Sequence, residues 1–225
     1  MSGHIEAIFG PMFSGKSTEL QRKIRRYRFA NKRCLVLNFH LDNRYSIEEV
    51  AVTHDKNMID ARKLQQLGDL TDEEIANHDV IAIDEGQFFV DLVEKAEEWA
   101  NKGKIVIVAA LDATFERRPF GNVCDLLAIS EIVEKLSSIC VLCGNNGHFT
   151  QRTSNSMDLK VVGGLEMYRP VCRTCFVRTE PQMHHSVRKL SVCGQSLNTI
   201  SGDEVSDLLE AAKLNSQKSI NIGNE

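Results

Sequence analysis

Short apolar runs alternate with amphipathic stretches through the N-terminal part of the chain. The apolar runs cover residues 5–9, 33–39, 80–85 and 104–111, and their length and content are typical of buried strands. Between them, residues 16–30 and 91–102 have the periodicity of helices. Strands that alternate with helices predict a parallel α/β sheet with right-handed crossovers.

Local signals refine the predicted helices. In the first helix, Leu20, Ile24 and Tyr27 fall on one face, and basic residues fill most of the rest. We expect these basic side chains to form a solvated face: Arg22, Lys23, Arg25, Arg26 and Arg28. Another helix is expected to begin at Thr71, because Glu74 follows three residues later as in a capping box.

Composition narrows the class of protein. The chain has 225 residues, of which 42% are hydrophobic, enough for one substantial domain with a small satellite. The formal net charge of −4 does not favour nucleic acid as a partner. No signal peptide and no apolar run near the ~18 residues of a membrane span is present, so we expect a cytoplasmic protein. Its seven cysteines are then expected to be thiols or metal ligands.

Residues 10–17, GPMFSGKS, have the pattern of a phosphate-binding loop. The predicted strand before them and the helix after them fit that context. Lys16 is expected to reach the β- and γ-phosphate oxygens, and the Ser17 hydroxyl to bind Mg²⁺. The full set of expected phosphate-binding residues here is Gly10, Pro11, Met12, Phe13, Ser14, Gly15, Lys16 and Ser17. The motif indicates a bound nucleoside triphosphate but leaves the phosphate acceptor open.

Carboxylates follow the predicted strands at the same edge of the sheet. Asp84 is expected to organise Mg²⁺ through water, and Glu85 to lie beside the γ-phosphate as a base. A base there can activate a hydroxyl acceptor or position water, so the pair does not distinguish a kinase from an ATPase. Asp42 and Arg44 follow another strand. They could order Mg²⁺-bound water and neutralise phosphoryl charge, or simply form a polar turn.

Four cysteines form the second strong signal. Cys140 and Cys143, and then Cys172 and Cys175, are two C-x-x-C knuckles separated by a long insertion. Together they complete a tetrahedral Cys₄ site, and because no ligand position stays open for water, the expected zinc is structural. A zinc clamp at the base of the insertion would reduce the entropy of holding it as a lid over the phosphate site.

The sequence texture divides the chain into three expected parts. Residues 1–136 form the ATP-binding α/β core, and residues 137–192 form the zinc-binding module, which is rich in cysteine, glycine and asparagine. Residues 193–225 are expected to be a disordered tail.

The ordered motifs GPMFSGKSTEL, LDNRYS, DEGQFF, LDATFERRPFG, CVLC…PVCRTC and VVGGLEMY closely resemble the thymidine kinase family of the cellular cytosolic type. The resemblance covers roughly residues 4–190. It implies a RecA-like core with helices on both faces of its sheet, a zinc-bearing lasso domain and a homotetramer. It also implies transfer of the γ-phosphoryl group of ATP to the 5′-hydroxyl of thymidine, and feedback inhibition by the nucleoside triphosphate product.

The resemblance also implies roles for individual residues. Glu85 corresponds to the catalytic base. Further nucleotide-binding residues are Asp42, Asn43, Arg44, Asp84, Gly86 and Gln87. Nucleoside-binding residues are Phe88, Phe115, Thr150, Leu159, Lys160, Val161, Val162, Gly163 and Tyr168, the run 159–163 through its backbone. Gly147 and His148 depart from the family pattern, which leaves deoxyuridine and deoxycytidine open as further acceptors.

Two other classes of function are open to this sequence. A phosphate-loop ATPase with a zinc ribbon could act on nucleic acid or protein, although the negative charge disfavours nucleic acid. A non-enzymatic zinc-ribbon module would leave Lys16, Asp84 and Glu85 without a role. A nucleoside kinase uses every feature and is the preferred interpretation.

Overall fold

The computed structural model describes residues 3–39, 61–153 and 167–179. Within these ranges a six-stranded sheet has the order β3-β2-β4-β5-β1-β6, and every neighbouring pair is parallel. Its strands are β1 (His4–Gly10), β2 (Cys34–Phe39), β3 (Arg62–Leu64), β4 (Val80–Asp84), β5 (Ile105–Leu111) and β6 (Ile132–Lys135). The central strands are buried along almost their whole length, as the apolar runs predicted.

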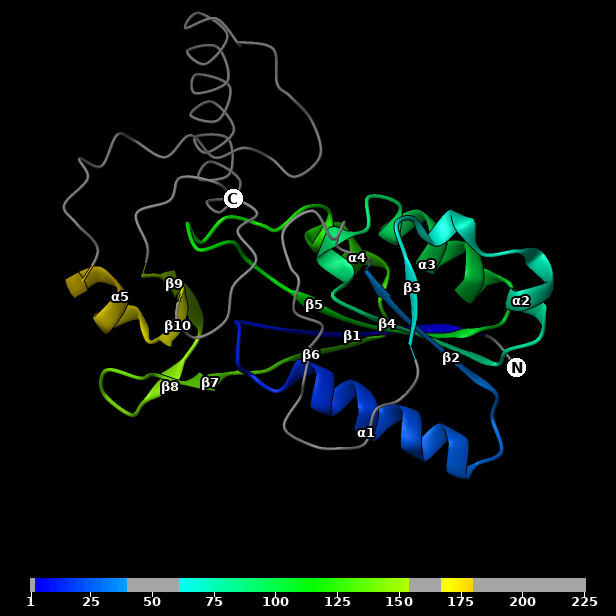
Figure 1. The fold of residues 1–225 in the computed structure, drawn as a ribbon, viewed down its shortest axis with the longest axis horizontal. Coiled ribbons are helices and arrows are strands. Elements are labelled where there is room, and N and C mark those ends of the chain that lie inside the picture. The colour runs from blue at the N-terminus through cyan, green and yellow to red at the C-terminus, as the bar shows by residue number, and fades with distance from the viewer. Residues whose placement is uncertain (1–2, 40–60, 154–166, 180–225) are drawn as a thin grey trace, which may run out of the picture. The chain divides into compact units, whose positions relative to one another are not determined.

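Helices cover both faces of this sheet (Figure 1). One face carries α1 (Lys16–Phe29), and the other carries the short η2 (Leu67–Asp69) with α2 (Asp72–Ala76), α3 (Leu92–Asn101) and α4 (Val123–Ile129). The predicted α/β class is therefore confirmed. In the described part of the chain, no helix is long and apolar enough to cross a membrane.

The strand order brings the expected chemical groups to one edge. The register pairs Gly10, the last residue of β1, with Leu111, the last residue of β5. The next strand along is β4, whose last residue is Asp84. In a parallel sheet the carboxyl ends of all strands meet at the same edge, which is where such folds bind ligands. The phosphate loop after β1 and the carboxylates after β4 therefore lie on either side of the end of β5.

Local signals located some elements and missed others. Thr71 caps α2: its hydroxyl accepts from the Glu74 backbone N–H at 3.3 Å, and the Glu74 carboxylate accepts from the Thr71 N–H at 2.9 Å. This confirms the predicted capping box. Strand β6 was not predicted, because it lies at the edge of the sheet and Ile132 and Val133 are nearly half exposed. An edge strand of this kind leaves no buried apolar run in the sequence.

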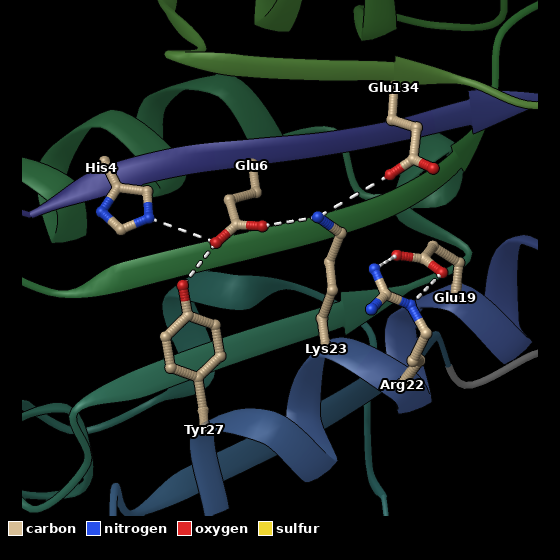
Figure 2. A network of polar contacts seen from close by, with 7 residues as sticks. All are labelled: His4, Glu6, Glu19, Arg22, Lys23, Tyr27 and Glu134. Carbon is tan, nitrogen blue, oxygen red and sulfur yellow. Dashed lines mark hydrogen bonds and ion pairs between the residues drawn. The ribbon is translucent and has the colours of Figure 1, made fainter. Parts of the chain in front are cut away.

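The expectation of a solvated basic face on α1 is wrong for Lys23, which is buried (Figure 2). Its Nζ donates to Glu6 Oε2 at 2.8 Å and lies 3.8 Å from Glu134 Oε2. Glu6 points from β1 toward α1, where its other oxygen accepts from Tyr27 Oη at 2.6 Å and contacts His4 Nε2 at 3.2 Å. The buried carboxylate explains why a lysine faces the sheet, since a buried charge requires a partner.

Burial and the hydrogen bonds of this network shift the pKa values of Glu6 and Tyr27. Burial raises the pKa of Glu6, but the hydrogen bonds from Lys23, Tyr27 and His4 outweigh burial and leave that pKa below its ordinary value. Burial and the hydrogen bond to Glu6 raise the pKa of Tyr27 to about 12, so its phenol stays a donor. Glu6 is therefore an ionised carboxylate between the helix and the sheet, and both of its oxygens have polar partners.

A smaller unit, which we call the cysteine module, follows the core. It consists of β7 (Ser138–Ile139), β8 (Asn146–Gly147), β9 (Phe149–Arg152), β10 (Tyr168–Val171) and α5 (Arg173–Thr179). β7 pairs with β8 and β9 with β10, both antiparallel. Its own small core contains Cys140, Val171, Cys175 and Phe176. The division at residue 137 stays a prediction, and the tail 193–225 lies outside the described residues.

Candidate active site

The phosphate loop connects β1 directly to α1. Gly15 has a φ of 85° and Phe13 a φ of 63°, so the loop reverses through left-handed conformations before the helix begins at Lys16. A glycine adopts this conformation without steric cost, which explains Gly15. The Lys16 ammonium donates to the Pro11 carbonyl at 2.9 Å and thus lies back across the loop. This arrangement places the helix N-terminus and the lysine together, as a phosphate site requires.

Carboxylates surround Lys16. Burial lowers its pKa, while the negative charges of Glu85, Asp84 and Asp112 act in the opposite direction. Asp112 was not singled out from the sequence. It directly follows β5 and forms a 2.7 Å ion pair with Lys135 of β6. The strand order β5-β1-β6 means that this pair spans the end of β1, where the phosphate loop begins.

Ser17 and Asp84 lie together as the sequence predicted. The Ser17 hydroxyl donates to Asp84 Oδ1 at 3.2 Å, and the backbone N–H of Glu85 donates to the same oxygen at 3.0 Å. Burial and the neighbouring Glu85 raise the pKa of Asp84 to about 6. A serine hydroxyl beside a carboxylate is an all-oxygen donor set, which is the chemistry that Mg²⁺ prefers. These two residues therefore fit a Mg²⁺ site shared with nucleotide phosphates.

Glu85 has an unusual backbone conformation. β4 ends one residue earlier than predicted, at Asp84, and Glu85 adopts φ 54° and ψ 38° before the short η3 (Gly86–Phe88). At Gly86 a Cβ atom would lie 2.8 Å from Val108 Cγ1, so the chain can turn this closely only with glycine. Left-handed non-glycine residues cost free energy and cluster at functional sites. Glu85 therefore lies in the turn that follows β4, and Gln87 Nε2 donates a hydrogen bond to its carboxylate at 2.6 Å.

Phe88 lies in an aromatic cluster beside this turn. Its ring is 5.4 Å from that of Phe39 and 5.6 Å from that of Phe120, the latter in an edge-to-face arrangement. Phe88 is half buried, so part of its side chain stays accessible beside the Glu85 turn. The sequence did not indicate the contact of Phe120, because it joins the loop before α4 to η3 across a long sequence separation.

Phe115 and Tyr168 meet through Arg152. The Arg152 guanidinium lies 3.9 Å from the centroid of the Phe115 ring and 5.2 Å from that of Tyr168. It also donates to Tyr168 Oη at 2.6 Å. The structure therefore brings together two residues that the resemblance assigned to nucleoside binding, one from the loop after β5 and one from the cysteine module. Arg152 itself was not predicted, since no motif marks it.

Thr150 links the cysteine module to the phosphate loop. Its hydroxyl oxygen accepts a hydrogen bond from the Met12 backbone N–H at 3.0 Å, and the residue is 6% exposed. The resemblance implies that Thr150 belongs to the nucleoside pocket, and this role stays a prediction. Its observed contact is with the phosphate loop, so β9 helps to position that loop.

Several expected site residues are not among the contacts given above. Asp42, Asn43 and Arg44, and the run Leu159, Lys160, Val161, Val162 and Gly163, lie outside the described residues. His148 is exposed. Gly147 is packed so closely against the module that a Cβ atom would lie 3.1 Å from the Cys140 backbone nitrogen. The departure from the family pattern at Gly147 thus has a packing explanation.

The four knuckle cysteines converge. The sulfur atoms of Cys140, Cys143, Cys172 and Cys175 all lie within 4.8 Å of one another, and those of Cys143 and Cys172 are 3.6 Å apart. Tetrahedral zinc–thiolate bonds of about 2.3 Å place sulfur atoms roughly 3.8 Å apart, so the spacing fits zinc. Burial raises the pKa of Cys140, but backbone N–H groups of Cys172 and Leu142 outweigh it and lower that pKa to about 6. In the same cluster the hydrogen bond with Cys143 and burial raise the pKa of Cys175 to about 12, so metal binding would have to displace protons from the cluster.

The fold and the site together define a phosphate-loop α/β protein with carboxylates beside the loop lysine and an appended module of four clustered cysteines. Sequence comparisons then give the family. The thymidine kinase family model matches residues 3–176, and the chain belongs to that family. It is 49% identical over 175 residues to the thymidine kinases of Variola virus and Monkeypox virus, which covers 78% of this chain and 97% of each relative. It is 47% identical over 179 residues to thymidine kinase 1 of Dictyostelium discoideum, covering 78% of both chains.

Proposed function

We propose that the protein transfers the γ-phosphoryl group of ATP to the 5′-hydroxyl of thymidine, with Glu85 as the general base. One observation carries the chemistry: Glu85, whose backbone is left-handed, has its carboxylate within the electrostatic reach of the phosphate-loop lysine, at the same sheet edge. Membership of the thymidine kinase family supports ATP and thymidine as the substrates.

The donor half of the site is built from the phosphate loop. Backbone N–H groups and the helix N-terminus bind the phosphate oxygens, and Lys16 exchanges its Pro11 contact for the β- and γ-phosphates. Ser17 would hold Mg²⁺, and Asp84, which accepts from the Ser17 hydroxyl, would orient a water bound to the ion. When bound, Mg²⁺ neutralises charge on the β- and γ-phosphate oxygens.

The acceptor half uses Glu85. Its carboxylate takes the proton of the 5′-hydroxyl as that oxygen attacks the γ-phosphorus. The bond from the γ-phosphorus to the β,γ-bridging oxygen breaks, and ADP leaves with that electron pair. A base that a hydrogen bond already holds in place needs no reorganisation before it acts, and such positioning is one of the main ways in which a protein accelerates phosphoryl transfer.

The nucleoside is proposed to lie among the aromatic side chains that the resemblance assigns to its pocket. Phe88 lies one turn beyond the base, and Phe115 and Tyr168 are held together by Arg152. The backbone of residues 159–163 would complete the pocket. Aromatic walls bind every pyrimidine through stacking, so deoxyuridine and deoxycytidine are proposed as slower acceptors.

Zinc in the cysteine module is proposed to be structural, because all four ligand positions are thiolates and none is left for substrate. A homotetramer and feedback inhibition by thymidine triphosphate are also proposed, on the basis of the family. The exposed Ile132 and Val133 on the edge strand β6 support self-association. Light scattering measures the oligomeric state, and the rate of thymidine phosphorylation with and without the triphosphate measures the inhibition.

The decisive assay offers the protein γ-labelled ATP, Mg²⁺ and each deoxynucleoside in turn, with 5′-deoxythymidine as the control that lacks the acceptor hydroxyl. We expect labelled thymidine monophosphate, less label on the other pyrimidines and none on the control. Release of labelled phosphate without any labelled monophosphate would instead support the ATPase alternative.

A further inference from the structure

Both ends of the Gln87 side-chain amide form hydrogen bonds within the protein. Nε2 donates to Glu85 Oε2 at 2.6 Å, and Oε1 accepts from the backbone N–H of Leu111 at 2.9 Å. A backbone N–H can only donate, so it fixes which end of the amide carries the oxygen. The NH₂ group therefore faces the carboxylate. Gln87 is only 4% exposed, so neither contact competes freely with water.

These two bonds connect the candidate base to the neighbouring strand. Glu85 follows the last residue of β4 in a left-handed conformation, and Leu111 is the last residue of β5. The turn alone leaves the Glu85 side chain free to rotate about its own bonds. The amide restricts that freedom, because it ties Oε2 to a buried strand that pairs with the β1 end of the phosphate loop.

We infer that Gln87 is a positioning residue for Glu85 and not a ligand of the nucleotide, the role that the resemblance had given it. The amide holds Oε2, so that Oε1 can accept the proton of the acceptor hydroxyl. This inference rests on the proposed role of Glu85 as base. It predicts that Gln87 contributes to turnover only through Glu85.

A double-mutant cycle tests this dependence in the full-length protein. Gln87→Met removes both hydrogen bonds at similar volume, and it is measured with Glu85 intact and with Glu85→Gln. With Glu85 intact we expect kcat to fall about ten- to a hundredfold, as for a misplaced catalytic group, with both KM values within about twofold. In the Glu85→Gln background we expect no further fall in kcat.

Gln87→Leu is the second variant, because it also removes both hydrogen bonds and places no second carboxylate beside Glu85. It gives the same test should Gln87→Met fail to fold, and the same loss of kcat is expected. A raised KM for ATP in both backgrounds would overturn the inference in favour of phosphate binding. An equal loss of kcat in both backgrounds would overturn the inference in favour of a general structural role. A kcat within about twofold of wild type with Glu85 intact would also overturn it, because Gln87 would then not contribute to turnover. Near-normal turnover of the single variant Glu85→Gln would instead contradict the proposed role of Glu85 as the base.

Discussion

The hydroxyl oxygen of Thr150 lies 3.0 Å from the backbone nitrogen of Met12 and accepts its hydrogen bond. This bond joins a strand of the cysteine module to the third residue of the phosphate loop. The donor loop is therefore positioned partly by a module far away in sequence. Zinc binding and ATP binding should be coupled through this contact.

Replacing Thr150 by valine tests that coupling. Valine keeps the shape but leaves the Met12 N–H without its acceptor, a loss of about 1 kcal/mol. We expect the KM for ATP to rise about fivefold, with zinc content unchanged. Thr150→Ser keeps the acceptor and serves as the control. Unchanged ATP kinetics in Thr150→Val would show that the contact does not position the loop.

The buried pair between Lys23 and Glu6 makes a prediction about stability. Lys23→Met leaves the Glu6 carboxylate buried without its cation, which should lower the free energy of unfolding by about 3–5 kcal/mol. Arg22→Met is the control: that side chain pairs with Glu19 but is 54% exposed, so we expect a much smaller loss than for Lys23→Met. Urea unfolding measures both. Equal losses would mean that burial of Lys23 is energetically unimportant.

The same network predicts a dependence of stability on pH. The pKa of Glu6 is lower in the folded protein than in the unfolded chain. The folded state therefore binds fewer protons, and the contribution of Glu6 is present above the unfolded value of about 4.3 and lost as pH falls through the folded pKa. Glu6→Gln should flatten the fall in the unfolding free energy below about pH 4.3. An identical acid limb in wild type and Glu6→Gln would contradict this assignment.

Zinc removal should loosen the module and then the donor site. We expect Cys172→Ser to lose bound zinc, to lower the midpoint of thermal unfolding by at least about 5 °C and to raise the KM for ATP. Cys124→Ser, on α4 and outside the cluster, is the control. Full zinc stoichiometry and normal ATP kinetics in Cys172→Ser would refute the structural role of the metal.

Features with a local signature could be predicted from the sequence. The buried strands β4 and β5 contain continuous apolar runs, and β1 contains one that only Glu6 interrupts. The Thr71 cap needs only Glu74 three residues away, and the phosphate loop and the knuckles are motifs of fixed spacing. Each depends on side chains that are close in the chain. Physical chemistry then assigns their structure without knowledge of the tertiary packing.

Features that depend on distant partners could not be predicted. Lys23 is buried because Glu6 lies on the strand beneath it, and the sequence pattern around Lys23 alone indicates a solvated residue. Arg152 was overlooked because its contact with Phe115 joins the cysteine module to the loop after β5. The role of Gln87 in nucleotide binding stays a prediction, and its motif does not reveal that the Leu111 N–H donates to its amide oxygen.

The central claim is that Glu85 is the base for phosphoryl transfer, and single-turnover kinetics of Glu85→Gln test it most directly. The protein is saturated with Mg²⁺ and γ-labelled ATP, mixed with thymidine and followed for labelled thymidine monophosphate. We predict that the rate falls at least about a hundredfold while ATP affinity stays within about twofold of wild type. Transfer at the wild-type rate in Glu85→Gln would contradict the account.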